Sequence, residues 1–180
     1  MQAGLEILDR QGRSALTLRA CAAHAGVSHA APAHHFSGLA GLLGAIAKEG
    51  YQIFTTLMVE AREKAKQDPR AQLVAICDGY LAFSRAYPGL FQLMFNAGQD
   101  IEPDPELIQT AERAYAELAN ACAPFEPVQS HPQSTEIMVW SLIHGLACLL
   151  QGGQFRSPDA SQPTPTIDDI LPMLTLRKQT

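Results

Sequence analysis

The side chains with the clearest chemical use lie between Thr17 and Phe36, in the stretch TLRACAAHAGVSHAAPAHHF. Thr17 and Ser28 carry hydroxyl groups that favour helix N-caps, and Gly26 suits the left-handed turn that ends a helix. The spacing predicts two short helices joined by a tight turn, with Val27 as an apolar plug between them. Small residues and histidines on the second helix, over about residues 29–35, would let that helix enter a DNA major groove.

The predicted DNA contacts share the chemistry that phosphates and base edges require. Hydroxyl groups and the N–H groups at helix starts bind phosphates, and alanine can touch a thymine methyl group. These residues are Thr17, Arg19, Ser28, His29, Ala30, Ala31, Ala33, His34 and His35. Two alternatives for the histidines stay open. They are solvated surface residues, or they bind a metal ion. A shared metal site is disfavoured because His34 and His35 are adjacent and would point apart on a helix.

The charge of the chain is uneven. Residues 1–50 hold four Lys and Arg against three acidic residues, whereas residues 51–180 hold nine against fifteen. Only the N-terminal part can therefore face DNA without strong repulsion. Its net charge of +1 is low for a DNA-binding surface, because phosphate contacts supply much of the affinity.

Apolar residues recur at helical spacing along the rest of the chain. They predict helices over residues 2–11, 38–66, 69–87, 89–96, 106–123, 134–151 and about 167–177. Pro172 is expected to bend or shorten the last of these. No run shows the alternation typical of a strand. The fold class is therefore all-α, with a three-helix DNA-binding domain over residues 1–48 and a helical effector-binding and dimerisation domain over residues 49–180.

The segment 134–151, STEIMVWSLIHGLACLLQ, carries no charged residue after Glu136. Three interpretations compete for it. It is a transmembrane span, a helix buried within one subunit, or a helix buried against both its own subunit and a second copy. For a transmembrane span the segment is short, and it contains polar side chains. An apolar helix in a protein of this size fits the last two, and Ser141 and Gly145 would allow a close helix crossing.

No catalytic constellation is present. The sequence contains no G-x-S-x-G, no phosphate-binding glycine loop and no H-E-x-x-H, so we expect no enzymatic activity, no cofactor and no metal. The cysteines are Cys21, Cys77, Cys122 and Cys148, and their wide spacing favours free thiols over a zinc site or a disulfide. A redox-sensing thiol would need exposure and a lowered pKa. Because no signal peptide is evident at the start, the expected location is cytoplasmic.

The order of these elements resembles the N-terminal domain of the TetR/AcrR family of transcriptional repressors. The matching residues are Gly12, Leu16 to Arg19, Ala22, Ala25 to Ser28, His35–Phe36 and Leu42–Leu43. Trp140 and His144–Gly145 also resemble the Trp-His-Gly motif of one C-terminal class of that family. The resemblance implies a homodimeric regulator that binds a double-stranded DNA operator and is released by a small-molecule effector. It also implies that segments 134–151 and 167–177 pair in a four-helix dimer seam.

This chain departs from the family pattern at two positions in the head. The family usually has a phosphate-binding tyrosine where this chain has Ala33, and a lysine at the start of the long helix where this chain has Gly38–Leu39. The start also lacks the family's longer basic arm. These departures predict weaker phosphate anchoring and support an alternative, a helical small-molecule-binding homologue whose DNA-binding head is weakened or lost.

The predicted effector-binding residues are the larger apolar and aromatic side chains of the second domain, with one imidazole as a polar anchor. They are Phe54, Met58, Tyr80, Phe83, Phe91, Met94, Phe95, Tyr115, Trp140 and His144. The alternative for each is plain core packing. Trp140 and His144, one helical turn apart, are the preferred pair.

Overall fold

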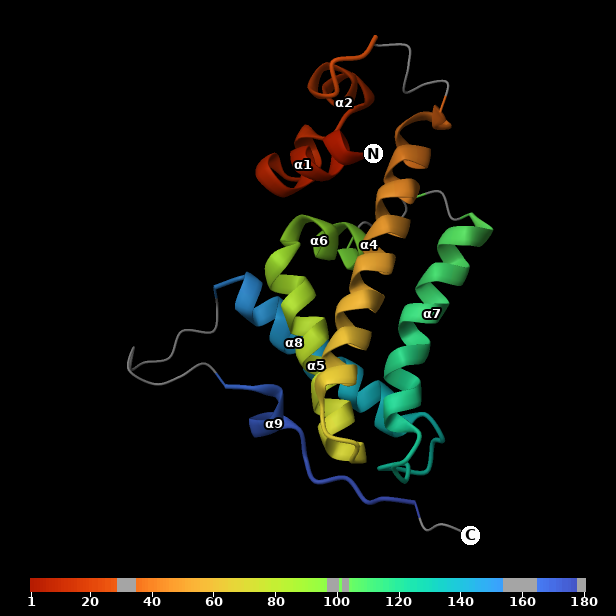
Figure 1. The fold of residues 1–180 in the computed structure, drawn as a ribbon, viewed down its shortest axis with the longest axis vertical. Coiled ribbons are helices and arrows are strands. Elements are labelled where there is room, and N and C mark those ends of the chain that lie inside the picture. Colours follow the sequence, from red (N-terminus) through yellow and green to blue (C-terminus); the bar gives the residue numbers. More distant parts are fainter. Residues whose placement is uncertain (29–34, 97–100, 102–103, 154–164, 178–180) are drawn as a thin grey trace. The chain divides into compact units, whose positions relative to one another are not determined.

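The structure is a computed structural model that describes residues 1–28, 35–96, 101, 104–153 and 165–177. Its regular elements are helical, as Figure 1 shows: α1 (Gln2–Gln11), a 3-10 turn (Arg13–Ala15), α2 (Leu18–His24), α4 (Gly38–Lys64), α5 (Pro69–Ala86), α6 (Pro88–Asn96), α7 (Pro105–Cys122), α8 (Ser134–Gln151) and α9 (Ile167–Ile170). Within the described ranges, the extended pairing is one isolated antiparallel bridge between Phe125 and Leu176. The all-α prediction is confirmed.

The chain divides into two compact units. Unit 1 comprises residues 1–53 and 86–113, and unit 2 comprises residues 54–85 and 114–180. Helix α4 contributes residues to both units, and so does α7. The boundaries of these packing units differ from the predicted boundary at residue 48. The division into a DNA-binding domain and an effector-binding domain therefore stays a prediction.

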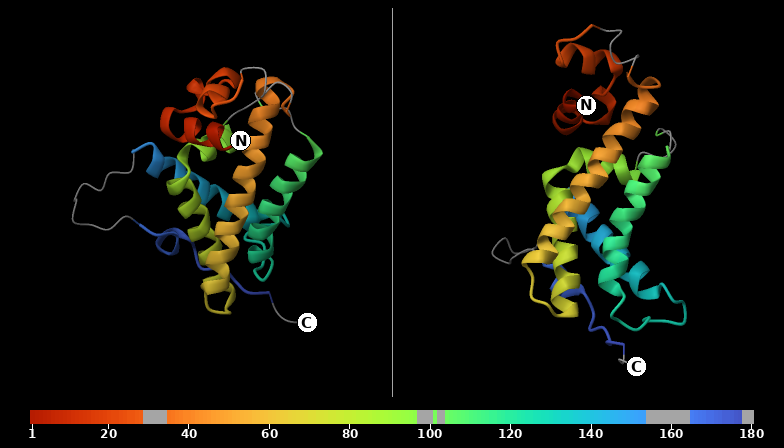
Figure 2. Two further views of the ribbon diagram at one scale, coloured as in Figure 1. Left: turned by 45° about the horizontal axis from the view of Figure 1, so that its top comes forward. Right: turned by 45° about the vertical axis from the view of Figure 1, so that its right-hand side comes forward.

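In unit 1, α1 packs against α2 and α6 (Figure 2). Ile7 and Leu8 of α1 are buried, as are Leu42 and Ile46 of α4. The contact with α6 is close, because a Cβ atom on Gly89 would lie 2.8 Å from the backbone oxygen of Leu8. The absence of a side chain at residue 89 therefore sets how closely α1 and α6 approach.

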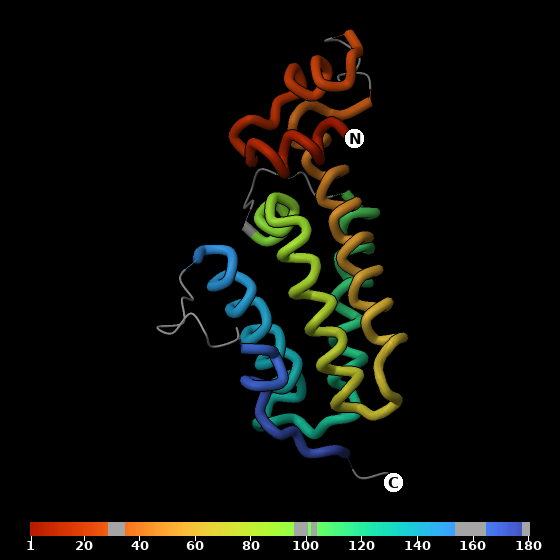
Figure 3. Tube along the Cα trace, turned by 60° about the vertical axis from the view of Figure 1, so that its left-hand side comes forward, coloured from red at the N-terminus to blue at the C-terminus, as the bar shows by residue number. Residues whose placement is uncertain are grey.

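In unit 2, α8 lies beside α5 (Figure 3). The core of this unit includes Leu73 and Ile76 of α5 and Val139 and Ile143 of α8, all with no exposed surface. The α4 and α5 backbones also meet closely, since a Cβ atom on Gly79 would lie 2.6 Å from Leu57 O. Of the three interpretations of segment 134–151, the transmembrane one finds no support: none of the helices within the described ranges is long and apolar enough to cross a membrane.

The prediction of a helix over residues 167–177 is wrong. Helix α9 begins at a capping box between Thr166 and Asp169 and ends at Ile170. Pro172 follows, and the residue before a proline is disfavoured in the helical conformation. The next residues are extended instead and pair with the segment after α7, where Glu126 N–H donates to Thr175 O over 2.8 Å.

One side chain of α5 binds α9 and the turn that follows it. The Arg70 guanidinium donates to Asp168 Oδ1 over 2.8 Å and to the carbonyl oxygens of Leu171 and Pro172 over 3.1 Å each. We call this set the Arg70 anchor. The turn after α9 thus pairs with α5, and the segment beyond it with residues 124–126, so residues 171–177 do not continue the helix expected in a dimer seam.

Candidate functional site

The start of α2 forms as the sequence predicts. Thr17 is the N-cap, and its hydroxyl oxygen accepts from Ala20 N–H over 3.0 Å. Gly26 has a φ angle of +67°, which confirms the left-handed turn after the helix. The expectation that Val27 is a buried plug is wrong, because its side chain is 48% exposed. The turn is closed by the Val27 backbone instead, whose N–H donates to Ala22 O over 3.0 Å.

The predicted DNA contacts within the described residues all lie on the surface. Thr17, Arg19, Ser28 and His35 are exposed. The other predicted contacts lie outside the described residues: His29, Ala30, Ala31, Ala33 and His34. The predicted contacts in the described part of the head therefore include one capped helix start and the exposed guanidinium of Arg19, and both can bind phosphate.

Two ion pairs of unit 1 involve basic residues of the head. Lys48 Nζ lies 2.6 Å from Glu106 Oε2, and this hydrogen bond raises the pKa of Lys48. His24 Nε2 lies 2.8 Å from Glu6 Oε2, and the bond to His24 lowers the pKa of Glu6. Lys48 is therefore partly neutralised, whereas Arg10 and Arg19 remain as exposed cations.

Aromatic side chains from α4 and α5 meet in unit 2. The ring of Phe54 lies 4.8 Å from that of Tyr80 and 5.1 Å from that of Phe83, centroid to centroid. Tyr80 Oη is 2.8 Å from His144 Nδ1 on α8. Burial lowers the pKa of His144, which keeps this imidazole neutral near pH 7. The cluster combines apolar rings with one neutral hydrogen-bonding group, as small-molecule sites do.

Trp140 has a different neighbour from His144. Its ring lies 5.8 Å from that of Tyr115, and its side chain is 40% exposed. The Tyr115 hydroxyl donates to Glu136 Oε2 over 2.6 Å, and this bond raises the pKa of Tyr115 to about 12. The two preferred effector residues thus share a helix but contact separate groups.

The remaining predicted effector residues are divided between the units. Met58 is buried in unit 2. Phe91 and Phe95 of unit 1 lie 5.0 Å apart, and Tyr51 lies 6.2 Å from Phe95. Met94 belongs to the same unit, near Gly50. The predicted set therefore comprises a cluster around Tyr80 and the pair Tyr115–Trp140 in unit 2, and a cluster around Phe95 in unit 1.

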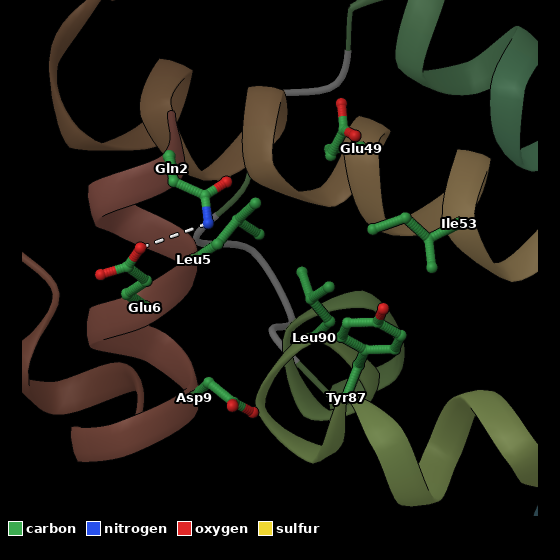
Figure 4. A pocket seen from close by; sticks show the side chains of 8 residues that line it. All are labelled: Gln2, Leu5, Glu6, Asp9, Glu49, Ile53, Tyr87 and Leu90. Atoms are coloured by element: carbon green, nitrogen blue, oxygen red, sulfur yellow. Dashed lines mark hydrogen bonds between the residues drawn. The ribbon is translucent and has the colours of Figure 1, made fainter.

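Sequence reasoning missed a cavity in unit 1. It has a volume of about 290 Å³ and lies between α1, α4 and the junction of α5 and α6 (Figure 4). The residues that line it are Gln2, Leu5, Glu6, Asp9, Glu49, Ile53, Tyr87 and Leu90. The only signal in the sequence is the position of acidic residues beside apolar ones on two predicted helices. Nothing in the sequence indicates that those helices meet there.

The cysteines differ in their surroundings. Cys21, Cys77 and Cys122 are buried, and desolvation raises the pKa of each thiol. Cys148 is exposed, with its Sγ atom 3.5 Å from His144 Nε2. Among the described residues, no group of three or more His, Cys, Asp or Glu is arranged to hold a metal ion.

Comparisons with known proteins identify relatives of this chain. A curated relative, the HTH-type transcriptional regulator BetI of Stenotrophomonas maltophilia (strain R551-3), is 28% identical over 154 residues, which are 84% of this chain and 76% of the relative. A solved structure of a protein from Rhodococcus sp. RHA1 matches with a TM-score of 0.72 at 26% identity, covering 93% of this chain and 84% of that one.

The fold also matches the TetR-family transcriptional regulator PfmR from Thermus thermophilus, with a TM-score of 0.61 at 16% identity, over 94% of this chain and 90% of that one. The family model for the tetracyclin repressor-like, C-terminal domain matches residues 73–171. The Trp-His-Gly subclass stays a prediction. Because the matched residues make up more than half of its length, the chain belongs to the TetR family of transcriptional regulators.

Proposed function

We propose that this TetR-family regulator acts as a repressor: it binds a double-stranded DNA operator as a homodimer and leaves it when a small-molecule effector binds. The observation that carries the proposal is the start of α2, where Thr17 caps the helix, Arg19 is exposed and Gly26 turns the chain. In a helix-turn-helix the first helix crosses the DNA backbone, and its free N–H groups and cations contact phosphates. The nine predicted DNA contacts remain part of this proposal.

Arg19→Ala is expected to weaken operator binding by roughly tenfold near 0.1 M salt, because it removes one phosphate contact from each subunit. The slope of log affinity against log salt should fall by about one for each phosphate that is no longer neutralised. Fluorescence anisotropy on the DNA upstream of the gene, titrated across salt concentrations, measures both quantities.

The control for this experiment is Arg85→Ala, which removes an exposed charge from α5. Equal effects of the two substitutions would contradict the placement of DNA at α2. No binding at low salt by the folded wild-type protein would favour the second candidate function, a small-molecule-binding homologue with a weakened head. The pairing of Lys48 with Glu106 is the observation that favours this candidate, because it occupies one of the few cations of the head.

For the effector, the cluster of Phe54, Tyr80, Phe83 and His144 is the proposed site. It supplies an apolar surface with a neutral imidazole as its polar anchor. Such a site selects a small, mostly apolar molecule that carries one hydrogen-bonding group. Met58, Tyr115 and Trp140 of unit 2 and Phe91, Met94 and Phe95 of unit 1 are kept in the proposal as further candidate effector contacts.

The proposed dimer surface is an uncovered stripe along α8. Ile137, Trp140 and Leu149 are 52%, 40% and 42% exposed, and Ser141 and Cys148 are exposed between them. A Cβ atom on Gly145 would meet nothing within 4 Å, so a second backbone has room to approach there. We call Ile137, Trp140, Ser141, Gly145, Cys148 and Leu149 the α8 stripe. An uncharged stripe with small central residues suits a helix pair between two copies of the chain.

Cys148 gives a direct test of this surface, since it is the exposed thiol and lies on the α8 stripe. We expect N-ethylmaleimide to label Cys148 rapidly in dilute protein and at least about tenfold more slowly at concentrations where the dimer forms, because a partner would cover it. Mass spectrometry identifies the labelled cysteine, and the buried thiols serve as internal references.

Leu149→Glu is the matched variant. It places a charge on the α8 stripe at an exposed position, so the subunit should fold while the dimer dissociates and Cys148 reacts rapidly at every concentration. Sedimentation velocity checks the mass. A labelling rate that is independent of concentration in the wild-type protein, or a dimer that survives the glutamate, would exclude α8 as the dimer surface.

A further inference from the structure

The cavity of unit 1 has apolar walls and an acidic rim. Leu5 of α1, Ile53 of α4 and Leu90 of α6 supply aliphatic surface, and the Tyr87 ring stands at the junction of α5 and α6 (Figure 4). Its volume of about 290 Å³ is at the small end of the range for ligand sites. The cavity can therefore hold a compact molecule whose body is hydrocarbon.

The charged residues that line this cavity are all acidic. Glu6 and Asp9 come from α1 and Glu49 from α4, and none of the described lining residues is Lys, Arg or His. Glu6 already pairs with His24 and accepts from Gln2 Nε2 over 3.3 Å. Asp9 and Glu49 form no ion pair with any residue in the described part of the chain. Lys48 lies next to Glu49 and interacts with it electrostatically, but its ion pair is with Glu106. Within the described residues, Asp9 and Glu49 thus add two carboxylates from different helices to the lining of one cavity, and neither is held in an ion pair.

We propose that this cavity binds a small organic cation, an ammonium group carried on a compact hydrocarbon body. The carboxylates of Asp9 and Glu49 would neutralise the ammonium group, Leu5 and Leu90 would cover the hydrocarbon, and the Tyr87 ring offers a face that attracts a cation. An anion would be repelled. A bare metal ion would gain nothing from the aliphatic walls, and the described residues provide no arrangement of three metal ligands.

This site is separate from the aromatic cluster around Tyr80 and goes beyond the proposed function. A bound cation would touch α1, α4 and α6 of unit 1 at once, and α1 in turn packs against α2. Binding of a cation in the cavity would therefore affect the packing of α1 against α2, which supports the head. The proposal does not depend on DNA binding, because occupancy can be measured on the full chain alone.

The test compares three probes of one shape. Benzylammonium, benzyl alcohol and benzoate are titrated separately into the full-length protein, and methyl NMR signals of Leu5, Ile53 and Leu90 report binding at the cavity. We expect benzylammonium to bind at least about fivefold more tightly than benzyl alcohol, and benzoate not to bind. Equal affinity of the ammonium and the alcohol, or shifts confined to residues elsewhere, would overturn the proposal.

The variant that tests the charges is the double substitution Asp9→Asn and Glu49→Gln, which keeps the shape of both side chains. It should lower benzylammonium affinity to that of benzyl alcohol while leaving benzyl alcohol unchanged. Glu112→Gln removes an exposed carboxylate of α7 that does not line the cavity, so it should have no effect. If the control variant lowers affinity as much as the double variant does, binding reflects overall charge and the proposal fails.

Discussion

Gly79→Ala is expected to destabilise unit 2 by about 2–3 kcal/mol, although alanine is the better helix former. A Cβ atom on residue 79 would lie 2.6 Å from both Leu57 O and Met58 Cα. These are backbone atoms of α4, and no side-chain rotation can move them away. The two helices must therefore separate, and the contacts between α4 and α5 loosen along their length.

Urea unfolding followed by the fluorescence of Trp140 measures this effect, because this residue is the single tryptophan of the chain and belongs to unit 2. Gly145→Ala is the matched control: a Cβ atom there meets nothing within 4 Å. In protein dilute enough to be monomeric, it should leave the unfolding free energy unchanged or raise it by up to about 1 kcal/mol. Similar destabilisation by both substitutions would show that the α4–α5 approach is not the cause.

Phe83→Ala is expected to cost about 3–5 kcal/mol of unfolding free energy, the range for removing a fully buried aromatic ring. The Phe83 side chain has no exposed surface, and its ring lies 5.1 Å from that of Phe54. The same urea titration measures the change. Ile137→Ala, at a position that is 52% exposed, should change the free energy by less than about 1 kcal/mol in monomeric protein.

This second result bears on the effector site. Phe83 is among the predicted ligand contacts, yet its complete burial means that a variant at this position loses stability together with any effector response. A measured cost below about 1 kcal/mol would contradict the core assignment and would show that the structure opens readily around residue 83. Effector experiments are therefore better made at His144, which is partly exposed and bonded to Tyr80.

Much of the fold was predictable because its signals are local. Thr17 caps α2, Gly26 forms the turn after it, and Pro69 begins α5 at the expected residue. The predicted segment 134–151 coincides with α8. In each case the deciding interaction lies within one or two helical turns, so composition and spacing contain it.

What could not be predicted depends on residues far apart in the sequence. Lys48 pairs with Glu106, and Arg62 donates to Glu117, across more than fifty residues in each case. The cavity joins Asp9, Glu49 and Tyr87 from separate parts of the chain.

The predicted length of the last helix was also wrong, because α9 ends at Ile170. Pro172 indicated a bend or an early end to the predicted helix, but the partner of the residues after it lies far away in the sequence. The hydrogen bond from Glu126 to Thr175 stabilises the extended conformation there.

The Arg70 anchor has a consequence for local unfolding. Because one guanidinium holds Asp168 and the carbonyl oxygens of Leu171 and Pro172, these contacts form or break together. Amide hydrogens of residues 167–171 should therefore exchange with solvent as one cooperative group rather than fray residue by residue. In a cell, such all-or-none opening would make this stretch either fully protected from proteases or fully available to them.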